Sequence, residues 1–114
     1  MSTVDDLQEI LSKMPQAFVP ERAANLDAVV QLELTGEGGG QWAVKIANGR
    51  IAIEQGVADP NNLTLTMDAG DYVALSLGEA NPVNLFMAGK IKVEGDPTLA
   101  LKFQDLFDRN RVDD

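Results

Sequence analysis

Alternating apolar residues between positions 28 and 53 constrain the fold of this chain most. In the segments 28–34, 42–46 and 51–53 every second residue is apolar, which is typical of strands with one buried face. A glycine-rich loop at 36–40 separates the first two segments. The Asn48-Gly49 pair, the strongest short hairpin signal, separates the last two. The sequence therefore predicts an antiparallel meander of three strands.

Each turn also predicts which residues face one another across the strands. A hairpin centred on Gly38 gives three facing pairs: Leu34 with Trp42, Leu32 with Val44, and Val30 with Ile46. A two-residue turn at Asn48-Gly49 gives two more: Ile46 with Ile51, and Val44 with Ile53. Both turns place the same residues on one face, and a shift by one residue would turn them away from it. We therefore expect that face to be buried.

Capping residues and prolines predict where the helices before and after this meander begin and end. A first helix is capped by Thr3 and closed by Pro15, and a short second helix begins at Pro20. After a fourth alternating strand over 63–67, Asp68 caps a further helix. The apolar faces of these helices are expected to be formed by Val4, Leu7, Leu11, Met14, Tyr72, Val73 and Leu75.

The last third of the chain contains a short helix, a strand and a final helix. Residues 78–82 interrupt the helix that follows Asp68, and it resumes over 84–87. The strand 90–94 alternates again, with Ile91 and Val93 inward, and Asp96-Pro97 begins the final helix. The sequence predicts a single α+β domain over residues 1–114, with a five-stranded antiparallel-rich sheet and helices covering one face.

Composition excludes several functional classes. The chain has no cysteine and no histidine, so it lacks a disulfide framework, the commonest general base and the commonest transition-metal ligand. Its formal net charge is −9, and its nine lysines and arginines are scattered, which disfavours nucleic acid and allows at most transient membrane contact. No basic, apolar leader or membrane-spanning run is visible. We expect a cytoplasmic protein without metals or cofactors.

Three polar motifs have plain structural interpretations. The glycines of 36–40 lie between two strands, whereas a phosphate loop joins a strand to a helix. The segment 59–62 lacks the glycine and distal glutamate of a calcium loop and is interpreted as a turn. The carboxylate pairs Asp5-Asp6, Asp68 with Asp71 and Asp113-Asp114 lie at helix starts or in the tail, where they favour capping and solubility over acid–base chemistry.

The segment from Phe86 to Phe107 has an ordered pattern of glycines, lysines and apolar residues. It contains Gly89-Lys90-Ile91-Lys92-Val93, then Gly95-Asp96, Leu99-Ala100-Leu101-Lys102 and Leu106-Phe107. This pattern resembles the sterol carrier protein-2 (SCP2) lipid-transfer family.

Upstream segments match the same family in order. They are Trp42-Ala43-Val44-Lys45-Ile46 with Asn48-Gly49, and Asp71-Tyr72-Val73-Ala74-Leu75 with Gly78. The resemblance extends from about Val4 to Asp108. The chain ends Val112-Asp113-Asp114 rather than in the peroxisomal tripeptide of animal and fungal members, which indicates a prokaryotic or cytosolic relative.

The resemblance implies a non-catalytic domain with an apolar tunnel between the sheet and the helices. Its ligand would be a hydrophobic lipid, such as a fatty acid, an acyl-CoA, or a sterol-like or isoprenoid molecule. The final helix, after Gly95-Asp96-Pro97, is the expected gate. The expected lipid-binding wall is Leu32, Leu34, Trp42, Val44, Ile46, Ile53, Leu65, Met67, Tyr72, Leu75, Phe86, Met87, Phe103, Leu106 and Phe107.

Alternation alone also allows a second interpretation, because core-facing and ligand-facing residues follow the same pattern. In that alternative the core is filled, and the chain is a protein-interaction, dimerisation or accessory module. Such a module can form a homodimer. An internal cavity distinguishes the two interpretations.

Overall fold

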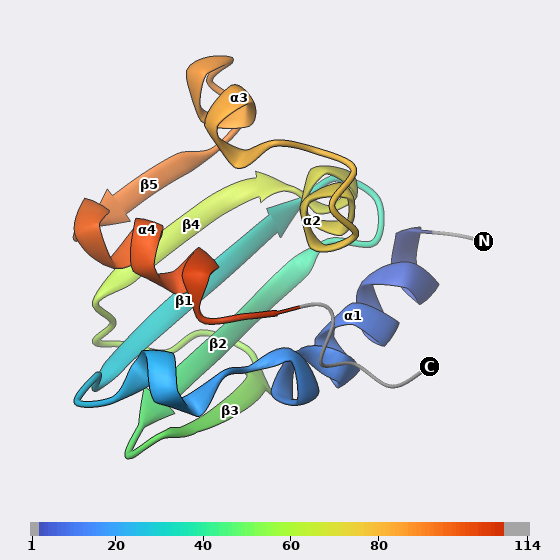
Figure 1. The fold of residues 1–114 in the computed structure, drawn as a ribbon. Coiled ribbons are helices and arrows are strands. Elements are labelled where there is room, and N and C mark those ends of the chain that lie inside the picture. Colours follow the sequence, from blue (N-terminus) through green and yellow to red (C-terminus); the bar gives the residue numbers. More distant parts are fainter. Residues whose placement is uncertain (1–2, 109–114) are drawn as a thin grey trace.

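The computed structural model describes residues 3–108, and Figure 1 shows their arrangement. In chain order the elements are α1 (Thr3–Ala17), the 3₁₀ helix η1 (Pro20–Ala23), β1 (Ala28–Thr35), β2 (Gly40–Ala47), β3 (Arg50–Gln55), β4 (Leu63–Asp68), α2 (Ala69–Ser76), α3 (Pro82–Met87), β5 (Lys92–Gly95) and α4 (Pro97–Asp105). None of the helices described over residues 3–108 is both long and apolar enough to cross a bilayer.

The five strands form one sheet in the order β3-β2-β1-β4-β5. The central strand β1 pairs in parallel with β4, and the other three strand pairs are antiparallel. The helices α1, α2 and α4 lie on one side of this sheet (Figure 1). The predicted α+β class, with an antiparallel-rich five-stranded sheet covered on one face, is confirmed.

The register of the first hairpin differs by two residues from the predicted one. Leu32, rather than Leu34, lies opposite Trp42, and Val30 lies opposite Val44. The turn is centred on Glu37 instead of Gly38, because Gly36 and Gly38 adopt the positive φ values of 82° and 80° and the Gly39 N–H donates to the Gly36 carbonyl (3.1 Å). A shift of two residues preserves the face, so the same side chains still point inward.

The second hairpin has the predicted register. Asn48 and Gly49 both have positive φ (56° and 73°), as a type I′ turn requires. Ile46 pairs with Ile51, and Val44 pairs with Ile53.

The predicted end of α1 and the predicted start of β5 were wrong. The helix α1 continues past Pro15 to Ala17, because an exposed proline near the end removes one donor and the Phe18 N–H still donates to the Met14 carbonyl (3.0 Å). The strand β5 begins at Lys92 rather than Lys90, because the Lys90 N–H donates to the Leu85 carbonyl at the end of α3 (2.9 Å). The predicted cap at Thr3 and the packing of Val4 fall outside the described side chains.

The capping predictions for α2 and α4 are confirmed. The Asp68 carboxylate accepts from the Gly70 N–H (2.8 Å), and the Asp96 carboxylate accepts from the N–H groups of Thr98 and Leu99 (2.9 and 3.4 Å). The helix α3, predicted from residue 84, begins earlier, at Pro82. There the Asn81 side chain accepts from the Val83 N–H (2.8 Å).

The hydrophobic core fills the space between the inner face of the sheet and the helices. Its most completely buried side chains include Leu7, Leu32, Ile46, Leu63 and Leu106, each with less than 2% of its surface exposed. Side chains from α1, from three central strands and from the C-terminal segment thus meet in one cluster. This packing leaves the other part of the covered face, over β4 and β5, for the site described next.

Candidate functional site

A cavity of about 1400 Å³ lies between the helices and the β4–β5 half of the sheet. Its wall is formed by side chains from α1, β4, α2, α3, β5 and α4. Typical small-molecule sites have about 300–1,000 Å³, so this cavity is large for a domain of 114 residues. Several lining side chains, among them Val83 and Leu101, are exposed, so the cavity is open to solvent on one side.

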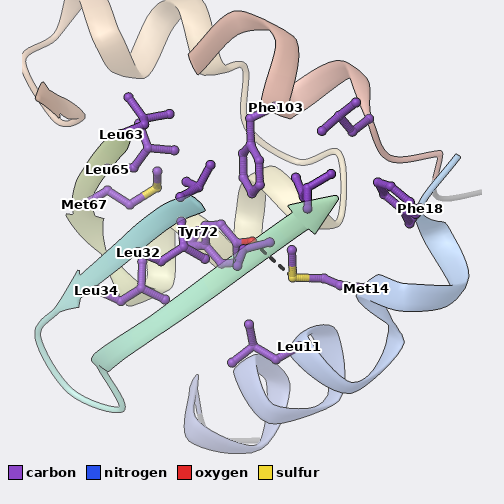
Figure 2. Close-up of a cluster of buried hydrophobic side chains, with 14 of the residues drawn as sticks. Leu11, Met14, Phe18, Leu32, Leu34, Leu63, Leu65, Met67, Tyr72 and Phe103 are labelled. Carbon is purple, nitrogen blue, oxygen red and sulfur yellow. Dashed lines mark hydrogen bonds between the residues drawn. The ribbon is translucent and has the colours of Figure 1, made fainter. Parts of the chain in front are cut away.

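Seven of the predicted wall residues line this cavity. They come from β4, α2, α3, α4 and the C-terminal segment: Leu65, Met67, Tyr72, Leu75, Phe86, Phe103 and Phe107. Figure 2 shows several of them beside the buried cluster of β1. Their contact with a lipid stays a prediction.

The structure places the other eight predicted residues away from the cavity. Leu32, Leu34, Val44, Ile46 and Leu106 are buried in the core, Trp42 and Ile53 pack against it half-buried, and Met87 is 79% exposed. The helix α2 contacts β1, and α1 contacts β3 at the edge beside β2. The inward side chains of β1 and β2 therefore belong to one buried cluster with side chains of these helices. Alternation identified the correct face but not the part of that face that stays open.

Sequence reasoning missed lining residues on three elements. On α1, Ile10, Met14 and Ala17 line the cavity, and their spacing of four and three residues is that of one helical face. On β5, Ile91 and Val93 line it, as their inward alternation could have indicated. The sequence predicted an apolar face for α1, and the position of this helix beside α2 brings part of that face to the cavity.

Charged residues line the cavity on the side of α1 and η1. The Lys13 ammonium group lies 2.9 Å from the Glu9 carboxylate, and the Arg22 guanidinium donates to the Asp105 carbonyl (3.1 Å). Asp6 and Asp108 also contribute to the lining there. The wall is therefore chemically asymmetric, with charged groups on this side and aliphatic and aromatic groups over β4, β5 and α4.

Tyr72 places one polar group in the buried part of the wall. Its side chain is only 7% exposed, and its hydroxyl donates to the Met14 sulfur (3.4 Å; Figure 2). Burial raises the pKa of the Tyr72 phenol well above its ordinary value, because the charged form would lose its hydration. The phenol is thus a neutral donor whose acceptor, a thioether, is weak.

The C-terminal end of α4 is held against the segment that follows α1. The Val19 N–H donates to the Leu106 carbonyl (2.8 Å), and the Asp108 N–H donates to the Ala17 carbonyl (2.7 Å). The Phe107 ring packs edge-on against Phe103, with ring centres 5.3 Å apart. These bonds restrain the predicted gate helix at this end.

Residues 3–108 contain no group of three acidic, cysteine or histidine side chains that could hold a metal ion. The Asp68 carboxylate, considered above as half of an acid–base pair, is bonded to the Gly70 N–H at the start of α2. Asp68 also does not belong to the cavity lining. Its observed role is therefore that of a helix cap.

Comparison with known proteins agrees with this architecture. Residues 7–108 match the model of the SCP-2 sterol transfer family. Hydroxysteroid dehydrogenase-like protein 2 from Xenopus tropicalis is 30% identical over 102 residues, which cover 89% of this chain and 24% of the relative. The chain thus spans about a quarter of the length of such curated relatives.

Solved structures show the same fold. The crystal structure of sterol carrier protein 2 like 2 from Aedes aegypti has a TM-score of 0.73 at 24% identity, covering 90% of this chain and 96% of that one. The solution structure of the palmitated form of that protein has a TM-score of 0.63 at 25% identity, with coverages of 84% and 88%. With a family match over almost its whole length and a shared fold, this chain belongs to the SCP-2 sterol transfer family.

Proposed function

We propose that this domain binds one hydrophobic lipid in the cavity beneath α3 and α4 and carries it through water. The cavity of about 1400 Å³, with its wall of aliphatic and aromatic side chains, is the observation that supports the proposal. A long-chain fatty acid is the first candidate ligand, because the related Aedes aegypti protein is described as palmitated. Acyl-CoA, sterol-like and isoprenoid molecules are the other candidates.

A cavity of this volume cannot be both sealed and dry. A sealed dry void of this volume would cost on the order of 30 kcal/mol, at about 24 cal/mol per Å³. That cost exceeds the whole stability of an ordinary domain, roughly 5–15 kcal/mol. The space must therefore hold water or a ligand. An acyl chain that buries about 15 methylene groups recovers about 12 kcal/mol, at about 0.8 kcal/mol for each group.

The asymmetric wall suits an amphiphile with one polar end. Charged side chains of both signs, among them Glu9, Lys13 and Arg22, line the cavity on the α1 side, while Val93, Ala100 and Phe103 line its apolar part. The polar end can thus stay in water on the charged side while the acyl chain enters the apolar part, which avoids the cost of burying an unpaired charge.

The proposed function is binding without chemistry. Tyr72, the buried titratable group of the wall, stays neutral, and its hydroxyl is occupied by the Met14 sulfur. The dehydrogenase relative is about four times as long as the matched segment, so the activity in its name is not assigned to this domain.

A blocked cavity tests the proposal. Ala100 lines the apolar part of the cavity from α4 and is half-buried, whereas Ala52 is exposed on the edge strand β3 and does not line it. Ala100→Phe should therefore weaken palmitate binding at least tenfold in titration calorimetry of the delipidated protein, and Ala52→Phe should leave it unchanged.

Ligand-linked stability gives a second readout. Palmitate at 100 times its Kd should stabilise the wild-type protein by about 2.7 kcal/mol, and this gain should be lost in Ala100→Phe. The proposal would be refuted if the delipidated wild-type protein bound none of the four candidate lipid classes and gained no stability from any of them. That result would favour the interaction module.

A further inference from the structure

The hydroxyl of Tyr72 differs from the other polar groups of the cavity wall. Within residues 3–108, the other polar or charged residues of the lining are half-buried or exposed, so water can reach them. Tyr72 is 7% exposed, so its hydroxyl depends on a partner inside the protein. The partner that this hydroxyl has without a ligand therefore bears on which ligands the cavity prefers.

This hydroxyl lies where the cavity-facing sides of two helices meet. On α2, Tyr72 shares one face with Leu75 and Ser76, three and four residues further on, and all three line the cavity. On α1, Met14 shares a face with Ile10, four residues earlier, and both line the cavity. The bond from the Tyr72 hydroxyl to the Met14 sulfur (3.4 Å) joins these two faces (Figure 2). The donor is therefore placed at the wall of the cavity.

The partner of the hydroxyl is easily replaced by a better one. A thioether sulfur is a weak acceptor, whereas a carbonyl or hydroxyl oxygen is a strong one. The methionine side chain is unbranched and flexible, so the Met14 sulfur can turn away when another atom approaches the phenol. In an apolar wall the bond from the phenol to an oxygen is also stronger than in water. An oxygen atom of a ligand can therefore take the place of the sulfur.

The charge of the ligand oxygen decides whether it fits beside Tyr72. A carboxylate buried against one neutral donor would keep most of its cost of desolvation. The cations on the α1 side have partners of their own, since Lys13 pairs with Glu9 (2.9 Å) and Arg22 donates to the Asp105 carbonyl (3.1 Å). A ketone or hydroxyl oxygen carries no charge, and a single donor satisfies it. The phenol is therefore matched to a neutral oxygen.

We propose that Tyr72 is a specificity-determining residue, which selects lipids that carry a neutral oxygen, a ketone or a hydroxyl, within their apolar body. When such a lipid binds, the phenol O–H turns from the Met14 sulfur to this oxygen. The lipid then regains inside the protein the hydrogen bond that it loses on leaving water. A plain acyl chain leaves the bond between Tyr72 and Met14 in place. This inference rests on the proposed lipid binding and narrows its preferred ligands to oxygenated lipids.

Lipids of equal length test this selection. The probes are stearate and three stearates that carry one ketone near the carboxylate, in the middle or near the tail. In titration calorimetry of the delipidated full chain, at least one ketone isomer should bind the wild type as tightly as stearate or more tightly. Tyr72→Phe removes only the hydroxyl. It should lower the affinity for that isomer, relative to stearate, by about tenfold, because a buried carbonyl is then left without its hydrogen bond.

Two further variants separate the hydrogen bond from the shape of the wall. Met14→Leu removes the competing acceptor and keeps the phenol, so it should raise the affinity for the same isomer, relative to stearate, by about threefold. Phe103→Leu changes an apolar side chain of the lining instead. It should shift both affinities together and leave their ratio within about twofold, because neither lipid gains or loses a hydrogen bond there. Circular dichroism checks that each variant folds.

Infrared spectroscopy of an isotope-labelled ketone observes the bond itself. A hydrogen bond lowers the stretching frequency of a carbonyl, so the bound ketone should absorb at lower frequency in the wild type than in Tyr72→Phe. Equal frequencies in the two proteins, or an affinity ratio that Tyr72→Phe does not change, would overturn the selection by Tyr72. In that case stearate binding by the wild type would still support the proposed function. A wild type that binds neither stearate nor any ketone isomer would refute both.

Discussion

A single buried amide side chain holds the connection between β3 and β4 against the sheet. Gln31 is 1% exposed and lies on the face of β1 opposite the core residues Val30 and Leu32. Its amide nitrogen donates to the Gly56 carbonyl (3.0 Å), and its amide oxygen accepts from the Ala58 N–H (2.8 Å). The substitution Gln31→Met keeps the length of the side chain and removes both hydrogen bonds.

The expected loss follows from these two bonds. Each hydrogen bond contributes about 0.5–1.5 kcal/mol to the free energy of unfolding. Each backbone partner that stays buried without a hydrogen bond would add about 1–3 kcal/mol to the loss. Gly56 and Ala58 are half-buried, so water can reach part of the freed groups. We expect Gln31→Met to lower the free energy of unfolding by about 2–3 kcal/mol, which for a domain of this size lowers Tm by roughly 10 °C.

Urea denaturation followed by circular dichroism measures this loss. Glu33→Met is the matched control, because Glu33 is half-buried on the same face of β1, two residues further on. The control should change stability by less than about 0.5 kcal/mol, as surface substitutions usually do. Equal small losses in both variants would refute the reasoning that Gln31 anchors the connection. Palmitate binding should persist in Gln31→Met, since this residue does not line the cavity.

Two further predictions concern Tyr72 and Asp96. Because burial raises the pKa of Tyr72, its stabilising contribution is intact below about pH 10, the ordinary tyrosine pKa, and is lost as pH rises above it. Tyr72→Phe removes the only tyrosine, so the free energy of unfolding should fall less between pH 8 and 11 in urea titrations. The same substitution should cost about 1 kcal/mol at pH 8. An unchanged pH profile would contradict the assignment. Asp96→Ala removes two hydrogen bonds at the start of α4 and should cost about 1 kcal/mol in the same assay. Asp96→Asn should retain most of the stability, because an amide oxygen can also accept at this position. Equal losses in the two variants would argue against capping.

Local signals in the sequence determined most of the elements. The Asn48-Gly49 pair specifies two positive φ values and hence a hairpin of known register. Asp68 and Asp96 specify helix starts, because their carboxylates satisfy N–H groups only a few residues away. The alternation of β1, β2 and β4 determined which side chains point inward. The flexible run Gly36–Gly40 left the first register open, because several of its glycines can adopt positive φ and only sheet pairing selects among them.

The tertiary structure alone decided where the covered face is filled and where it stays open. Leu32 and Leu65 face inward with the same alternation and both belong to the core, yet only Leu65 also lines the cavity. The difference arises from contacts between segments far apart in the chain. The helix α1 packs beside α2, and the end of α1 and the segment after it pair with Leu106 and Asp108, which leaves α4 over the β4–β5 half and α3 at the edge of the cavity. An alternation with a period of two residues shows which face of a strand is apolar. It does not show how far the helices lie from that face, because long-range packing sets the distance between the sheet and the helices.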